Sequence, residues 1–171
     1  VPLVLYTPRA FAEVMRDAQF STGLYYGIVL ALLFYNLVLW LMLRDSGYFW
    51  YLLHTGAFGL VLFTLNGYGF EYFWPNSAWL ADASVPLSIC LALVGMQLFT
   101  RSFLELQERW PRGNLVSLMV TGFFVVLGIA SFWLPYSTAT PLAALAVLAG
   151  VVWIMVATVV MLRRGYKPAR L

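Results

Sequence analysis

The chain has 171 residues, of which 63% are apolar, 18% aromatic and only 10% charged, and its formal net charge is +3. Water-soluble domains carry about 25% charged residues, so this composition excludes an ordinary soluble domain. The high hydrophobicity excludes a disordered chain, and the thinly spread basic residues exclude a nucleic-acid-binding protein, which needs a basic face. The single cysteine, Cys90, excludes an internal disulfide and a cysteine cluster for zinc or iron and sulfur.

Two short elements are expected in the first 20 residues. Residues 1–6 have the pattern of a β-strand, and residues 8–20 that of a helix, with Thr7 as its cap and Pro8 at its first position. Because an isolated strand is not stable, we interpret residues 1–20 as the end of a preceding domain followed by a juxtamembrane helix. This helix is expected either to lie on the membrane surface or to extend the first membrane span.

Five later segments contain no Asp, Glu, Lys or Arg and are long enough to cross a membrane. About 20 helical residues span a hydrocarbon layer of about 30 Å, and backbone groups in lipid must be paired within a helix or a closed barrel. Barrel strands would alternate in polarity, whereas these runs are continuously apolar. Residues 21–171 are therefore predicted to form an all-α, polytopic transmembrane bundle with spans at 23–43, 49–70, 83–100, 115–134 and 141–162.

Basic residues gather on one side of this predicted bundle. Because cytoplasmic loops retain Lys and Arg, the richer side is expected to face the cytosol. The N-terminus is then outside, where Arg9 and Arg16 are the two basic residues, and the C-terminus is inside. The cytoplasmic side carries eight: Arg44, Arg101, Arg109, Arg112, Arg163, Arg164, Lys167 and Arg170.

A few polar side chains lie within the spans. Asn36 falls near the middle of the first span, and Gln97 falls nearer the inner edge of the third. An unpaired amide in lipid is costly, so each is expected to hydrogen-bond to a neighbouring helix, with a hinge or ligand contact as the functional alternative. His54, the single histidine, is placed about one turn into the second span, where a hydrogen bond near Arg44 or Asp45 is favoured over haem ligation.

Other candidates lie at span ends or at helix-packing positions. Arg44 and Asp45 fall between the first two spans, where they cap the first helix or contact a cytoplasmic relay. Asn66 and Glu71 lie at the outer end of the second span, facing either interfacial solvent or an outer domain. Small residues four apart permit close packing of helices and give only weak support for a dimer: Gly23 and Gly27, Ser84 and Ser88, and Ala146 and Gly150.

No catalytic constellation is found in the sequence. The spans hold no acid pair, no Ser and His at plausible range, and no phosphate-binding glycine loop. No catalytic residue, metal site or cofactor is therefore expected. Two other classes stay open: a small-substrate transporter or channel, in which Asn36 and Gln97 would line a polar path, and a membrane anchor subunit that binds haem or quinone through His54.

A distinctive pattern surrounds the first two expected spans, formed by Tyr26, Gly27, Leu32, Tyr35, Asn36, Leu37, Leu43, Arg44, Asp45, Tyr48 and Tyr51. This pattern resembles the start of the membrane domain of a bacterial family, the seven-transmembrane receptors with diverse intracellular signalling modules. Further likenesses are Gly67 and Gly69, Trp74 and Pro75, and residues 99–104. The first residues, 1–11, resemble the last strand and linker of the sensor domain that commonly precedes that membrane domain.

The resemblance implies a sensory module of a bacterial inner membrane. It implies a periplasmic sensor domain, seven helices, and a cytoplasmic output such as a histidine kinase, diguanylate cyclase or phosphatase, acting in two-component or cyclic-di-GMP signalling. With five spans present, the chain is expected to be a fragment that ends before a sixth. The expected partners are the lipid bilayer, the chain's own sensor and output domains, and a second copy. The candidates for signal coupling are Tyr35, Asn36, Arg44, Asp45, His54, Asn66, Glu71 and Gln97.

Overall fold

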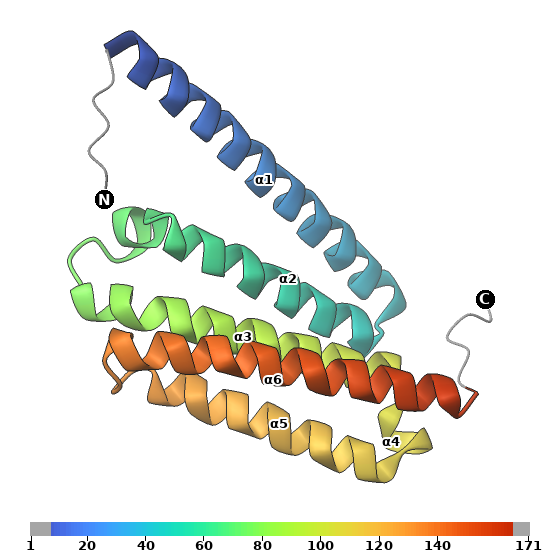
Figure 1. Ribbon diagram of the computed structural model, residues 1–171. Helices are drawn as coiled ribbons and strands as arrows, with labels where there is room; N and C mark the ends of the chain where they lie inside the picture. Colours follow the sequence, from blue (N-terminus) through green and yellow to red (C-terminus); the bar gives the residue numbers. More distant parts are fainter. Residues whose placement is uncertain (1–7, 166–171) are drawn as a thin grey trace.

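A computed structural model describes residues 8–165, and every regular element in this range is helical (Figure 1). The elements are α1 (Pro8–Leu43), α2 (Ser46–Leu65), the short π-helix η1 (Gly69–Phe73), α3 (Ala78–Phe103), α4 (Leu106–Arg109), α5 (Pro111–Ala130) and α6 (Tyr136–Arg163). Five of these helices, α1, α2, α3, α5 and α6, are long and apolar enough to cross a membrane. The predicted all-α bundle with five spans is confirmed, whereas the strand expected over residues 1–6 lies outside the described residues.

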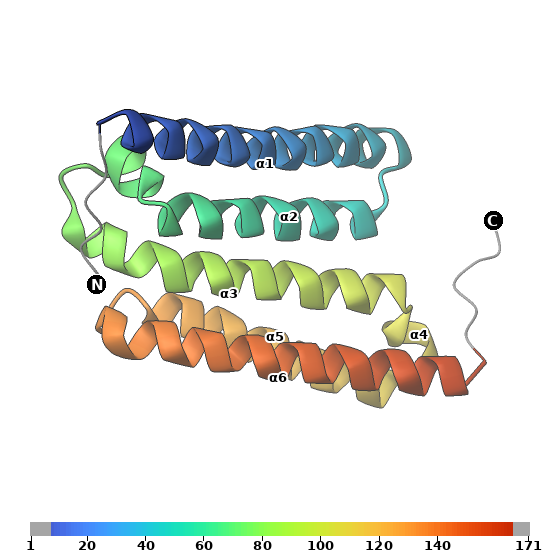
Figure 2. The ribbon, with the colours of Figure 1, turned by 45° about the horizontal axis from the view of Figure 1, so that its top comes forward.

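The helix α3 lies in the middle of the bundle, and α1 lies at one edge. Both ribbon views show the order α1, α2, α3, with α5 and α6 on the far side of α3 (Figures 1 and 2). In the most apolar stretch of α3, 61% of residues are buried, compared with 6% in α1. The α1 backbone packs against α2 and against no other described element. The first helix is therefore the least constrained part of the bundle.

The juxtamembrane helix extends the first span and does not form a separate surface element. The helix α1 runs without a break for 36 residues, which corresponds to a length of about 54 Å at about 1.5 Å per residue. A hydrocarbon layer is about 30 Å thick, so a large part of α1 either projects beyond it or is accommodated by tilt. In Figure 1 the N-terminal half of α1 leans away from α2.

Several helix ends differ from the expected span boundaries, because local caps decide them. The second helix stops at Leu65, not at residue 70, since Gly67 takes a φ of +83° that favours glycine and breaks the helix. The third helix begins at Ala78, not at residue 83, because the Ser77 hydroxyl accepts a hydrogen bond from the Leu80 amide at 3.3 Å. Pro86 is consequently buried in the interior of α3, beyond its first turn.

The fourth helix is displaced towards the N-terminus relative to its expected span, and the fifth begins before its expected span. The fourth, α5, begins at Pro111 and ends at Ala130, where the expectation was 115–134. Proline at the first helical position suits this start, since its missing N–H is not needed there. The fifth, α6, begins at Tyr136, so that Pro141 lies inside it and not at its start.

The centre of the bundle is a cluster of α3, α5 and α6 side chains around Phe124, which is fully buried. Leu93 and Ala146 pack in the same cluster. Gly150 allows α6 to approach, because a Cβ there would lie 3.2 Å from the Phe124 ring and 3.4 Å from the Gln97 amide nitrogen. Ala146 and Gly150 are thus located where α6 packs against the other two helices.

The other pairs of small residues are placed differently. Ser84 and Ser88 are buried in α3, and their hydroxyls donate to carbonyls of their own helix, those of Ala81 and Ser84. Gly23 and Gly27 are exposed, with no heavy atom within 4 Å of the position that a Cβ would occupy. The close helix packing expected at Gly23 and Gly27 is therefore not made within the described part of the chain.

Candidate functional site

The two ends of the bundle differ in charge. We call one the α4 end, since it holds α4, the α1–α2 turn and the end of α6, and the other the η1 end (Figure 1). Arg16 is the basic residue with a described side chain at the η1 end, among the acidic residues Glu13, Asp17, Glu71 and Asp82. The basic residues of the described α4 end are Arg44, Arg101, Arg109, Arg112, Arg163 and Arg164.

Arg44 and Asp45 form a tight turn at the α4 end. They are the two residues between α1 and α2, and Arg44 has a positive φ of 53° while its amide donates to the Trp40 carbonyl at 2.8 Å. The Asp45 side chain caps α2 by accepting a hydrogen bond from the Gly47 amide at 2.8 Å. This turn fixes the end of α1 to the start of α2.

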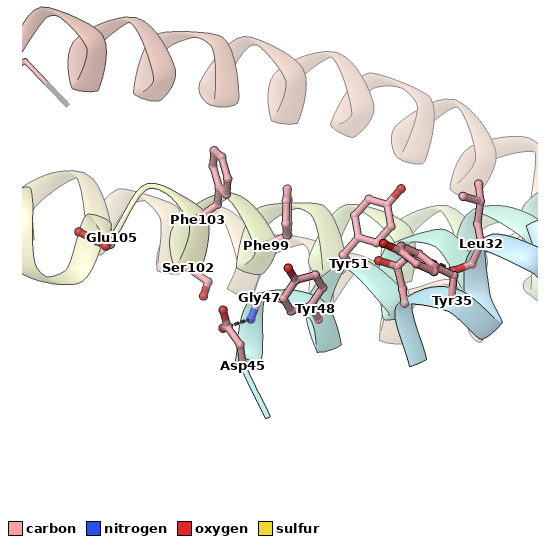
Figure 3. A pocket seen from close by; sticks show the side chains of 11 residues that line it. Leu32, Tyr35, Asp45, Gly47, Tyr48, Tyr51, Phe99, Ser102, Phe103 and Glu105 are labelled. Carbon is pink, nitrogen blue, oxygen red and sulfur yellow. Dashed lines mark hydrogen bonds between the residues drawn. The ribbon is translucent and has the colours of Figure 1, made fainter. Parts of the chain in front are cut away.

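A groove of about 730 Å³ opens beside this turn. Three helices form it: α1, the first two turns of α2, and the end of α3 with the following turn (Figure 3). We call it the α4-end groove, and its lining residues are Leu32, Tyr35, Asn36, Asp45, Gly47, Tyr48, Tyr51, Phe99, Ser102, Phe103 and Glu105. Six of these residues belong to the pattern on which the family resemblance is based, so the fold gathers that pattern at one place.

The α4-end groove is lined by aromatic rings and by polar groups, some of which already form an ion pair or a hydrogen bond. The Glu105 carboxylate pairs with the Arg109 guanidinium at 2.6 Å, and the hydroxyls of Ser46 and Ser102 lie 3.3 Å apart and join α2 to α3. The rings of Tyr51 and Phe99 are in contact, with centroids 5.6 Å apart. The walls from α2 and α3 are thus linked to each other, whereas the α1 wall is held through α2 alone. The shape of the groove therefore depends on the position of α1.

The two span amides make different contacts. Asn36 is buried, and its amide donates to the Leu32 carbonyl of the same helix at 2.8 Å. The interhelical hydrogen bond expected for Asn36 is therefore replaced by one within α1. The backbone carbonyl of whichever residue lies four positions earlier can accept such a bond. Gln97 is 1% exposed and donates to the Gly150 carbonyl of α6 at 3.3 Å, while its Oε1 is buried and accepts no hydrogen bond from the described part of the chain.

His54 lies deeper than expected and has a different partner. Because α2 begins at Ser46, His54 is more than two turns inside the helix. Its Nδ1 lies 2.8 Å from the Ala92 carbonyl of α3, and its ring stacks beside Phe58. The expected contact with Arg44 or Asp45 is wrong, since packing of α2 on α3 supplies the partner.

Asn66 and Glu71 lie at the η1 end. The Asn66 amide donates to the Tyr26 hydroxyl at 3.1 Å and so joins the end of α2 to α1. The Tyr26 ring also makes edge contacts with Phe63 and Tyr68. Glu71 is exposed in η1. Of the two, Asn66 thus provides a second connection between α1 and α2, at the opposite end from the turn.

The sequence did not predict that Phe99, Ser102 and Glu105 line the same groove as Tyr35 and Tyr48. They come from a part of the chain about 50 residues later, and their position follows from the antiparallel packing of α3 on α2. A signal was present in the likeness of residues 99–104 to the family. That likeness did not indicate which other residues these would meet.

The comparisons with known proteins identify the family. In residues 8–165, no three His, Cys, Asp or Glu side chains lie together as a metal site would require. Searches of curated proteins and of solved structures found no match. A family model described as 7TM diverse intracellular signalling matches residues 18–171. The chain therefore belongs to the 7TM diverse intracellular signalling family, as a multi-pass membrane domain with five candidate spans.

Proposed function

We propose that this chain is the transmembrane relay of a bacterial receptor. A binding event at the η1 end shifts α1, and the shift changes the α4-end groove, which biases an output module on the other side of the membrane. The observation that supports this function best is that α1 is one continuous helix from the η1 end to the groove, and that its backbone packs against α2 and against no other element of residues 8–165. Membership of a membrane signalling family supports the same function.

The charge distribution supports an orientation with the α4 end in the cytosol. Six arginines of residues 8–165 lie at the α4 end and two, Arg9 and Arg16, lie in the part of α1 at the η1 end, and cytoplasmic ends of membrane helices are enriched in basic residues. The N-terminus of α1 is then periplasmic and the end of α6 is cytoplasmic, in the inner membrane of a bacterium. The groove accordingly opens on the side where an output domain would act.

The geometry of α1 suggests how movement is transmitted. The two-residue turn holds the end of α1 at the α4 end, so that α1 behaves as a lever about Arg44. Tyr35 lies nine residues from Arg44, or about 13 Å along the helix, and the start of α1 lies about 54 Å from the turn. A sideways displacement at the start of α1 is thus reduced about fourfold at Tyr35, so a movement of about 4 Å outside becomes about 1 Å in the groove.

A ligand can drive this movement only by binding one arrangement of α1 more tightly than another. A change from 1% to 99% of one arrangement requires a difference in binding free energy of about 5.5 kcal/mol. Candidate outputs are a histidine kinase, a diguanylate cyclase or a phosphatase, acting in two-component or cyclic-di-GMP signalling. We further propose that the receptor works as a homodimer, on the strength of the resemblance.

A cross-link across the η1 end tests the relay. In the full-length protein with Cys90→Ala, the pair Tyr26→Cys and Asn66→Cys replaces the hydrogen-bonded side chains that join α1 to α2. A flexible bifunctional maleimide joins the two thiols, because the removed side chains leave them too far apart for a disulfide. A fluorotyrosine incorporated at Tyr48 reports on the groove by ¹⁹F NMR. We expect the cross-linked protein to give one resonance, and the protein without the cross-link to give a second or exchange-broadened resonance from the other arrangement of α1.

The matched control locks the same end of the bundle without involving α1. Trp79 on α3 contacts Phe132 in the α5–α6 turn, with ring centroids 5.5 Å apart, so the pair Trp79→Cys and Phe132→Cys serves this purpose. The same cross-linker on this control pair should leave the Tyr48 resonance as it is in the protein without a cross-link. If the α1 lock also leaves it unchanged, α1 does not carry a signal to the groove.

A further inference from the structure

A second groove lies between α2, α3 and α6, at membrane depth. The helix α3 forms its floor, and α2 and α6 form its walls without contacting each other in the described part of the chain. It has a volume of about 440 Å³, and it is lined by apolar side chains that include Phe58, Val61, Ile89, Met96, Val151 and Met155. We call it the α2–α6 groove.

Among the residues that the structure describes, His54 is the one polar side chain that lines this groove. The Ala92 carbonyl can only accept, so Nδ1 of His54 carries the proton of their 2.8 Å hydrogen bond. In an imidazole whose Nδ1 donates, Nε2 is the acceptor, and among residues 8–165 the hydrogen bond of the His54 ring is the one at Nδ1. An acceptor without a donor is costly in a hydrocarbon layer.

The chemistry of the groove restricts what can fill it. A lipid acyl chain would cover the apolar walls but has no donor for Nε2. A transmembrane helix has about the right width, because neighbouring helices pack with their axes about 8–10 Å apart and a helix seated on α3 would touch α2 and α6 as well. Hydrogen bonds and close packing drive such association in lipid, where hydrophobicity does not.

We infer that a further transmembrane helix of the same polypeptide fills the α2–α6 groove and donates a hydrogen bond to Nε2 of His54. The family is described by seven transmembrane helices, and this chain contains five candidate spans. Of the two grooves described above, the α2–α6 groove has the more apolar lining, and a helix seated in it would satisfy His54 at the same time. The inference concerns the packing of the bundle and is independent of how α1 moves.

Two neighbouring valines of α6 provide the test. Val151 lines the groove, whereas Val152 points elsewhere at nearly the same depth, and the two side chains are 47% and 60% exposed in this structure. In the full-length protein with Cys90→Ala, Val151→Cys or Val152→Cys is labelled with a nitroxide. The protein is delipidated and reconstituted in nanodiscs of synthetic phosphatidylcholine that contain one chain each, and collision with oxygen is measured by EPR.

We expect the label at position 151 to be at least threefold less accessible to oxygen than the label at 152. The ¹⁵N NMR signal of His54 Nε2, assigned by its loss in His54→Gln, should show a hydrogen-bonded acceptor. Equal accessibility of the two labels would overturn the inference. Shielding that appears only with two chains per disc, or only before delipidation, would overturn it too, since a second copy or a co-purified lipid-soluble molecule would then fill the groove.

Discussion

Replacing Gly95 with alanine is expected to force α2 and α3 apart and to destabilise the bundle by about 3 kcal/mol, at the upper end of the cost of overpacking. A Cβ at this position would lie 2.7 Å from the backbone nitrogen of His54 and 2.9 Å from its Cα. Side chains can rotate away from such a contact, but a helix backbone cannot. The two helices must therefore separate, and the hydrogen bond between His54 and Ala92 lengthens with them.

The measurement is unfolding of the purified protein in mixed micelles by titration with SDS, followed by circular dichroism. Gly122→Ala is the matched control, because no heavy atom lies within 4 Å of a Cβ at Gly122 on α5. Alanine is the better helix former by about 0.8–1 kcal/mol, so Gly122→Ala should be neutral or slightly stabilising. Equal midpoints for the two variants would show that α2 and α3 do not approach at Gly95 as described.

Removal of the Phe124 ring is the second change with a large expected effect. Phe124 is 0% exposed at the centre of the α3, α5 and α6 cluster, whereas the adjacent Phe123 is 57% exposed. The hydrophobic transfer of the ring contributes little to the stability of a bundle in lipid, because the bilayer is as apolar as the core. The cost of the substitution is then the van der Waals contacts that are lost around the cavity. A cavity of about 100 Å³ at about 24 cal/mol per Å³ gives a loss of about 2.4 kcal/mol for Phe124→Ala.

The control, Phe123→Ala, removes the same atoms from a side chain that faces outwards. Its expected cost is about 0.5–1 kcal/mol, because the exposed Phe123 ring loses its contact with the Phe124 ring, whose centroid lies 5.9 Å away. The same SDS titration distinguishes the two. A similar loss in both variants would mean that the rotation of α5 about its axis differs from the one described here.

The number and approximate position of the spans could be predicted from the sequence, because lipid imposes a strict rule. A charge-free run of about 20 residues has few alternatives to a membrane helix. The ends of the helices were harder to predict, because each depends on a single capping residue. The Ser77 hydroxyl starts α3 five residues before the expected span, and the positive φ at Gly67 ends α2 five residues early.

The partners of polar side chains could not be predicted from their positions along the chain. The Asn36 amide could have donated a hydrogen bond to its own helix or to a neighbouring one, and it donates to the Leu32 carbonyl of its own helix. His54 meets Ala92, which lies 38 residues away in sequence, only because Gly95 lets the two backbones approach. Tertiary packing decides these contacts, and a single sequence does not contain the helix rotations that determine it.

The family pattern gave more information about the site than composition did. Tyr35, Asn36, Asp45, Tyr48 and Tyr51 look unrelated along the chain, being spread over two helices and a turn. The fold places all of them around one groove, together with residues from the end of α3 (Figure 3). The pattern therefore indicated two walls of the candidate site, and the structure shows that the end of α3 forms the third.

The central claim is that the groove at the α4 end faces the cytosol while the start of α1 lies outside. Cysteine labelling from one side of the membrane tests it in the full-length protein with Cys90→Ala. Two exposed residues serve as probes, Glu108 in α4 and Asn76 between η1 and α3. With a membrane-impermeant maleimide on intact spheroplasts, we predict labelling of Asn76→Cys, and labelling of Glu108→Cys only after permeabilisation. Labelling of Glu108→Cys in intact spheroplasts, with Asn76→Cys protected, would contradict the account.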